Sequence, residues 1–148
     1  MDKIDAAASL DAVRETRARL AERMRWPLWR HAMTGVLLAV ILLAQALPNE
    51  YGLIVTALCL LPIFAIIAHD RKANGMLVSG YQKGRAGWVL ALLIGLYMAA
   101  FFWVRLGMTD PLSDPRFWAL EAVVILVATA LSYLWAKVYR EDLRAGRA

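Results

Sequence analysis

Four apolar blocks separated by charged stretches dominate this sequence. They run over residues 27–47, 51–68, 87–106 and 117–136. Roughly 20 helical residues cross a hydrocarbon core about 30 Å thick, which is about the length of each block. A backbone in lipid must satisfy its own hydrogen bonds, so such blocks form helices. A soluble bundle would need polar faces that these blocks lack. We therefore expect an all-α fold, a four-helix transmembrane bundle.

The composition agrees with a membrane protein. Of the 148 residues, 61% are hydrophobic and 20% charged, whereas a soluble domain is about half apolar and about a quarter charged. The single cysteine, Cys59, lies in the second block, so the sequence permits no disulfide within the chain. We divide the chain into a cytoplasmic amphipathic helix (1–26), a four-span membrane domain (27–138) and a basic cytoplasmic tail (139–148).

Lysine and arginine predict the orientation. Of the 17 such residues, only Arg105 and Arg116 lie beside the short connections that follow the first and third blocks. The rest lie in the N-terminal segment, the 69–86 connection and the tail. Because Lys and Arg accumulate on the cytoplasmic side, we expect both termini in the cytoplasm. This arrangement favours anionic lipid over nucleic acid as a partner. Asp114 is expected to cap the fourth helix, with Pro115 at its first position.

Basic and aromatic residues flank the predicted spans. The cations expected to contact lipid headgroups or a protein partner are Arg23, Arg25, Arg30, Arg71, Lys72, Lys83, Arg85, Lys137 and Arg140. The tryptophans expected to anchor the spans at the water–lipid boundary are Trp26, Trp29, Trp88, Trp103, Trp118 and Trp135. The segment SLDAVRETRARLAERM is amphipathic. It is expected to lie on the inner leaflet, to pair with a partner helix or a second copy, or to be a solvated helix.

Small residues recur at every fourth position in three of the blocks. The rows are Gly35 and Ala39; Ala91, Gly95 and Ala99; and Ala128, Ser132 and Ala136. This spacing lets helix backbones approach closely. It predicts either a compact bundle or contacts with another membrane protein.

Glu121 lies about one turn inside the fourth block, where a carboxylate is costly. Arg105 ends the third block at a similar depth on the predicted neighbouring helix. We expect an intramembrane ion pair between Arg105 and Glu121 that joins the two helices. The alternatives are a proton- or cation-linked role for Glu121, or a side chain that reaches back to water.

His31, His69 and Asp70 are candidate metal ligands, because antiparallel neighbours could bring the ends of the first two spans together. Against this, the histidines lack a short ligand spacing, and two interfacial histidines would explain them. The serines have no predicted histidine neighbour. We expect no catalytic set, no cofactor and no enzyme.

The charged amphipathic N-terminus, the P-x-W-x-H entry at Pro27–His31 and the four spans together resemble small uncharacterised bacterial integral membrane proteins. The resemblance implies no activity. We expect a multi-pass protein of a bacterial cytoplasmic (inner) membrane that acts as a non-enzymatic accessory or scaffold. Its partners would be the lipid bilayer and a membrane protein or further copies of itself. The alternatives are a small oligomeric transporter or channel that uses Glu121, and a membrane immunity or defence factor.

Overall fold

The structure, a computed structural model, describes residues 26–74 and 84–145, with Ser9 and short helical pieces at 12–13, 15–16, 18–19 and 21–22. The side chains of residues 70, 71, 73 and 74 are not among those described. The elements in chain order are α2 (Leu28–Ala46), α3 (Asn49–Asn74), α4 (Arg85–Gly107), the short 3₁₀ helix η1 (Pro111–Ser113) and α5 (Pro115–Arg144).

All four of these α-helices are long and apolar enough to cross a membrane. The described residues thus confirm the prediction of a helical fold with four helices that could each span a membrane. α3 and α5 extend furthest beyond the predicted spans, to Asn74 and to Arg144. The apolar pattern marks only the stretch that hydrocarbon can cover. Polar helix-forming residues continue each helix past that boundary.

The start of α5 follows the predicted capping pattern. The Asp114 carboxylate accepts a hydrogen bond from the Arg116 backbone N–H at 2.8 Å, and Pro115 occupies the first turn. The side chain thereby satisfies a donor that the helix leaves without a partner. The connection between α4 and α5 is closed further by the Trp118 indole, which donates to the Leu112 carbonyl at 3.1 Å.

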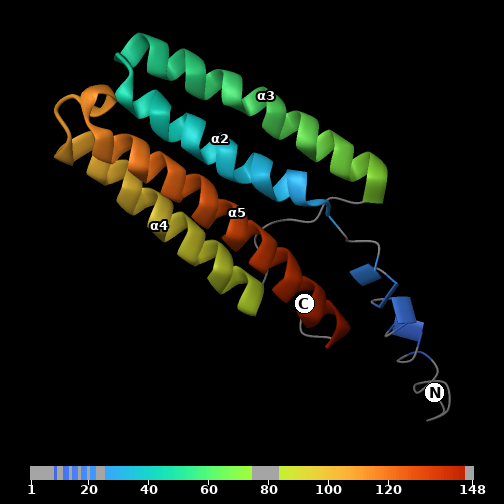
Figure 1. The fold of residues 1–148 in the computed structure, drawn as a ribbon. Coiled ribbons are helices and arrows are strands. Elements are labelled where there is room, and N and C mark those ends of the chain that lie inside the picture. The colour runs from blue at the N-terminus through green and yellow to red at the C-terminus, as the bar shows by residue number, and fades with distance from the viewer. Residues whose placement is uncertain are drawn as a thin grey trace.

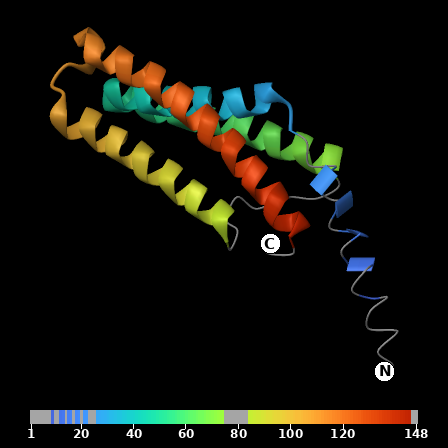
Figure 2. The ribbon, with the colours of Figure 1, turned by 60° about the horizontal axis from the view of Figure 1, so that its bottom comes forward.

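The helices are arranged around α2 and α5, which pack most extensively on each other. α4 lies along α5, and α3 lies along α2 on the other side (Figure 1). The short connections 47–48 and 108–114 lie together at one end, which we call the loop end. The opposite end, where α2 and α4 begin and α3 and α5 end, we call the basic end (Figure 2).

Two of the three small-residue rows form the contact between α2 and α5. Gly35 and Ala39 are buried on α2, and Ala128 and Ala136 are buried on α5. A Cβ added at Gly35 would lie closer than 3.0 Å to both Thr129 and Ile125 on α5. The two backbones therefore approach as the spacing of small residues predicts.

The third small-residue row lies on the exposed side of α4. Ala91, Gly95 and Ala99 are all exposed on α4. A Cβ added at Gly95 would meet nothing within 4 Å. The buried residues of α4, which include Ala100 and Val104, lie on the opposite side of this helix. Gly95, at the centre of the row, therefore faces away from α2 and α5, whereas Ala99 borders the groove between α4 and α5.

The core lies between α2, α4 and α5 near the loop end. Its buried residues are Ala39, Leu42, Ala100, Val104, Phe117 and Val124. A second cluster at the basic end contains Ala21, Ala86, Tyr139 and Leu143. Ala21 is fully buried there, so the N-terminal segment contacts the protein's own helices at this point. None of the three expectations for that segment included this contact.

The close contact at Gly35 predicts a strong effect of a single methyl group. Gly35→Ala should destabilise the protein by about 1–3 kcal/mol, because the added Cβ overlaps the α5 backbone. Reversible unfolding in mixed micelles of increasing denaturing-detergent fraction measures this change. Gly95→Ala is the matched control, since its Cβ meets open space. Equal destabilisation by both variants would contradict the described α2–α5 contact.

Candidate functional site

Glu121 belongs to the buried stripe of α5, near the start of this helix. Phe117, Glu121, Val124 and Ala128 follow one another at helical spacing, and all four are buried. Glu121 is 8% exposed, and its Oε1 atom has no hydrogen-bond partner among the described residues. The carboxyl group therefore lies among apolar side chains of the core.

The expected ion pair between Arg105 and Glu121 is not formed. No contact within 4.0 Å joins the two side chains, and Arg105 is exposed. Its guanidinium instead donates to Oδ1 of Asn49, at the start of α3, at 3.3 Å. Both residues lie toward the loop end, Arg105 in the last turn of α4 and Glu121 near the start of α5. The rotation of α4 separates them, because one residue corresponds to about 100° around a helix. Val104 faces the core, and Arg105 is turned toward α3.

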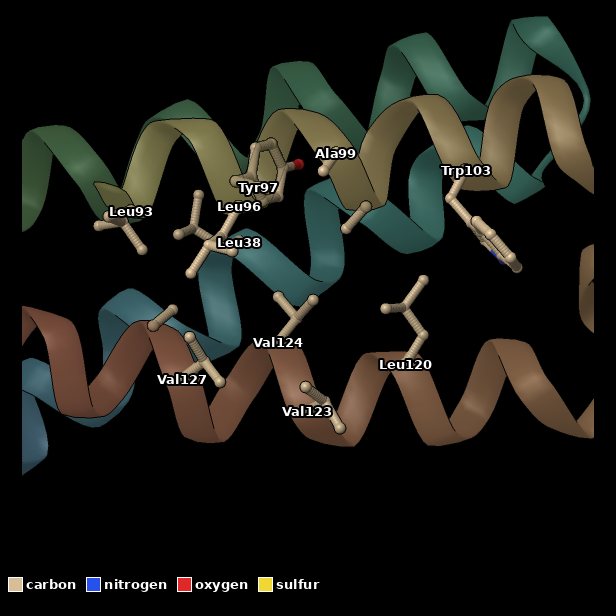
Figure 3. Close-up of a pocket in the computed structure, with 12 residues that line it drawn as sticks. Leu38, Leu93, Leu96, Tyr97, Ala99, Trp103, Leu120, Val123, Val124 and Val127 are labelled. Carbon is tan, nitrogen blue, oxygen red and sulfur yellow. The ribbon is translucent and has the colours of Figure 1, made fainter. Parts of the chain in front are cut away.

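One polar group from another helix lies near Glu121. The Tyr97 hydroxyl on α4 is also buried without a hydrogen-bond partner among the described residues. It lies within electrostatic range of both Glu121 and Cys59, the buried cysteine of α3. Figure 3 shows that this hydroxyl is directed toward the Trp103 end of α4. Tyr97 of α4 thus lies near both Glu121 of α5 and Cys59 of α3, and none of the three carries a positive charge.

The two histidines have different surroundings. His31 is buried, and its Nδ1 lies 2.9 Å from the Ser132 hydroxyl on α5. His69 instead packs edge-on against Trp29, with ring centroids 6.1 Å apart. The described residues contain no cluster of three metal-ligating side chains. The Asp70 side chain lies outside them. His31 therefore links α2 to α5, and the structure gives no support to the candidate metal site.

The six tryptophans separate into two groups. Trp29, Trp88, Trp103 and Trp118 are at least half exposed, as side chains at a water–lipid boundary would be. Trp26 and Trp135 instead stack on each other, and Trp135 also stacks on Tyr139. The Arg30 guanidinium carbon lies 4.2 Å from the centroid of the Trp26 ring. Sequence reasoning missed this stack, which depends on how α5 and the start of α2 meet.

An ion pair at the basic end was also missed. Arg85 lies 3.0 Å from Asp142 and 3.5 Å from Glu141, which joins the start of α4 to the end of α5. The Asp142 side chain is only 2% exposed. The sequence contained a signal for the burial of Asp142. Tyr139, Asp142 and Leu143 continue the helical spacing of the buried residues past Ala136.

The remaining predicted cations are placed only in part. Lys72, Lys137 and Arg85 are exposed, and Arg140 donates to the Ala136 carbonyl at 3.2 Å. Arg23, Arg25 and Lys83 lie outside the described residues, as does the Arg71 side chain. The described cations therefore gather at the basic end, apart from Arg105 and Arg116.

Comparisons with protein-family models, with curated proteins and with solved structures give no match to this chain.

The separation of Arg105 from Glu121 can be tested with a double-mutant cycle. We expect Arg105→Gln and Glu121→Gln to have additive effects on the free energy of unfolding, within about 0.5 kcal/mol, because residues without a shared contact act independently. Glu121→Gln alone should be neutral or stabilising, since it removes a buried acid. Measurement is by unfolding of each variant in mixed micelles. A favourable coupling above about 1 kcal/mol would show that the two residues pair.

Proposed function

We propose that this protein is a non-enzymatic accessory protein of a bacterial cytoplasmic membrane, with both termini in the cytoplasm. In this proposal it docks a transmembrane helix of a partner protein against α4, and it holds anionic lipid at its basic end. The observation that carries the proposal is the exposed row of Ala91, Gly95 and Ala99 on α4, at whose centre a Cβ added to Gly95 would meet nothing within 4 Å.

The other two small-residue rows support this interpretation by contrast. Both are used where α2 and α5 approach each other, so small residues in this chain mark sites of close helix contact. Between membrane helices, association depends on packing more than on apolar surface, since lipid is equally apolar. The row on α4 offers the same shallow surface. Leu92 and Phe102 on this side of the helix are about half exposed and could pack around a docked helix.

Gly95→Leu tests the docking face. The added side chain has room in the folded chain, so stability should be kept while the close approach of a partner helix is blocked. A photo-crosslinking amino acid at Leu92 should give a discrete protein adduct in native membranes, and Gly95→Leu should reduce that adduct about tenfold. That loss corresponds to about 1.4 kcal/mol of association free energy.

Gly107→Leu is the matched control, because a Cβ at Gly107 also meets nothing within 4 Å and Gly107 is the last residue of α4, about two turns beyond Ala99. It should leave the adduct unchanged. An adduct of twice the chain's mass would identify a second copy as the docked partner. Adducts with lipid alone, or adducts insensitive to Gly95→Leu, would contradict the proposal.

A proton-linked transporter is the second candidate function, and the unpaired Glu121 favours it. An isolated carboxylate in an apolar interior bears a large desolvation cost, which binding of a proton or cation removes. Arg105 does not supply the compensating charge. A carboxyl group that exchanges a proton within a membrane span is a common element of proton pathways.

A lipid-soluble carbodiimide tests this second candidate, since it forms a stable N-acylurea only with a carboxylic acid that can supply its proton. We expect one adduct on the intact protein, mapped to Glu121, and proton flux in liposomes that Glu121→Gln abolishes. Glu50→Gln, which removes an exposed carboxylate at the loop end, should leave both unchanged. Absence of proton flux in wild-type liposomes would exclude the transporter.

A further inference from the structure

We propose that the basic end of the protein holds one anionic phospholipid, with its phosphate in a pocket between α2, α4 and α5 and an acyl chain in the groove between α4 and α5. This inference rests on the lipid-binding part of the proposed function and gives it a specific site.

The polar half of the site is a cavity of about 210 Å³ at the basic end. Its cation is Arg30, and two tryptophans, Trp26 and Trp135, contribute to its wall. The other lining residues are Thr34, Val89, Leu90, Leu93, Leu131 and Ser132. No aspartate or glutamate is among these lining residues, so the cavity favours a ligand group of negative charge.

Two hydrogen-bond donors in this wall are left unused. The indole Nε1 atoms of Trp26 and Trp135 are buried and have no partner among the described residues. An indole N–H can only donate, and burying it without an acceptor costs about 1–3 kcal/mol. The two rings stack with centroids 5.8 Å apart, and the Arg30 guanidinium lies over the Trp26 ring. Phosphate and ester oxygens are acceptors that suit such a set of donors.

The hydroxyl groups of the cavity are already engaged. Thr34 donates to the Arg30 carbonyl at 3.3 Å, and Ser132 is hydrogen bonded to His31. Glu141 and Asp142 contact Arg85 and do not line the cavity. The ammonium group of a zwitterionic lipid would therefore find no carboxylate in the lining. We assign the site to a phospholipid with a net negative charge for this reason.

The apolar half is a groove of about 320 Å³ between α4 and α5. Figure 3 shows Leu93 and Leu96 of α4 facing Val124 and Val127 of α5 across it. Leu93 lines both the groove and the polar cavity, so the groove continues from the cavity toward the loop end. Apart from the Tyr97 hydroxyl and the Trp103 indole N–H, its lining is hydrocarbon. The site thus has a charged part followed by an apolar part, as a phospholipid has a charged headgroup followed by an acyl chain.

The test is native mass spectrometry of the full chain released from micelles that contain equal amounts of phosphatidylglycerol and phosphatidylcholine. We expect one phosphatidylglycerol to be retained in preference to phosphatidylcholine. Replacing both donors with Trp26→Phe and Trp135→Phe keeps the stacked rings and removes the N–H groups. Retention should then fall about tenfold or more, as the loss of two hydrogen bonds to a charged acceptor requires. Trp88→Phe, at the same end but 80% exposed, is the matched control.

A second pair of variants tests the groove independently of the tryptophans. Val127→Phe fills the groove and should lower retention, whereas Leu126→Phe, one residue away and 69% exposed, should not. Inorganic phosphate should not displace the lipid, because it lacks the chain. Displacement by phosphate would show an anion site without a lipid.

Equal retention of the two lipids by the wild-type protein would overturn the site. So would an equal loss of phosphatidylglycerol retention in Trp88→Phe and in the double variant Trp26→Phe with Trp135→Phe. The α4 crosslink is expected to persist in the tryptophan variants, so the lipid site and the docking face can fail separately.

Discussion

The close approach of α2 and α5 is the contact on which the other helix positions depend. It is possible because Gly35 presents no side chain toward Ile125 and Thr129. With these two helices fixed, α4 packs along α5, and α3 packs along α2. α3 and α4 themselves bury little of their surface within the chain. The protein is thus a tightly packed central pair that carries two outer helices, whose apolar surfaces are left for lipid or protein.

Much of this fold could be predicted from the sequence, because hydropathy and helix length depend on residues that are adjacent in the chain. The four long apolar helices, the Asp114 cap and the small-residue contact of α2 with α5 are of this kind. The predicted Arg105–Glu121 ion pair failed because it depended on the rotation of a helix about its own axis. The depth of Arg105 was predicted, yet the direction of its side chain was not. Depth follows from counting residues, whereas direction follows from how Val104 and its neighbours pack.

At the basic end, too, the sequence did not predict which side chains are buried. Trp26 and Trp135 have the sequence positions of membrane-boundary anchors, which Trp29 and Trp88 match with exposed side chains. The Trp26 and Trp135 rings are turned inward only because α5 packs against the residues before α2. Asp142, in a segment that reads as a basic tail, is buried by the same packing. Segments at the edge of a span are therefore where composition says least about which side chains become interior.

The Arg85–Asp142 contact has a mechanical consequence. At the loop end, the capped start of α5 and the Trp118–Leu112 hydrogen bond restrain one end of the α4–α5 hairpin. At the basic end, Arg85 ties the other end of α4 to α5. A helix restrained at both ends cannot turn freely about its own axis. A molecule that meets α4 therefore finds the outward surface already oriented, and the entropy cost of orienting it is met during folding of the chain.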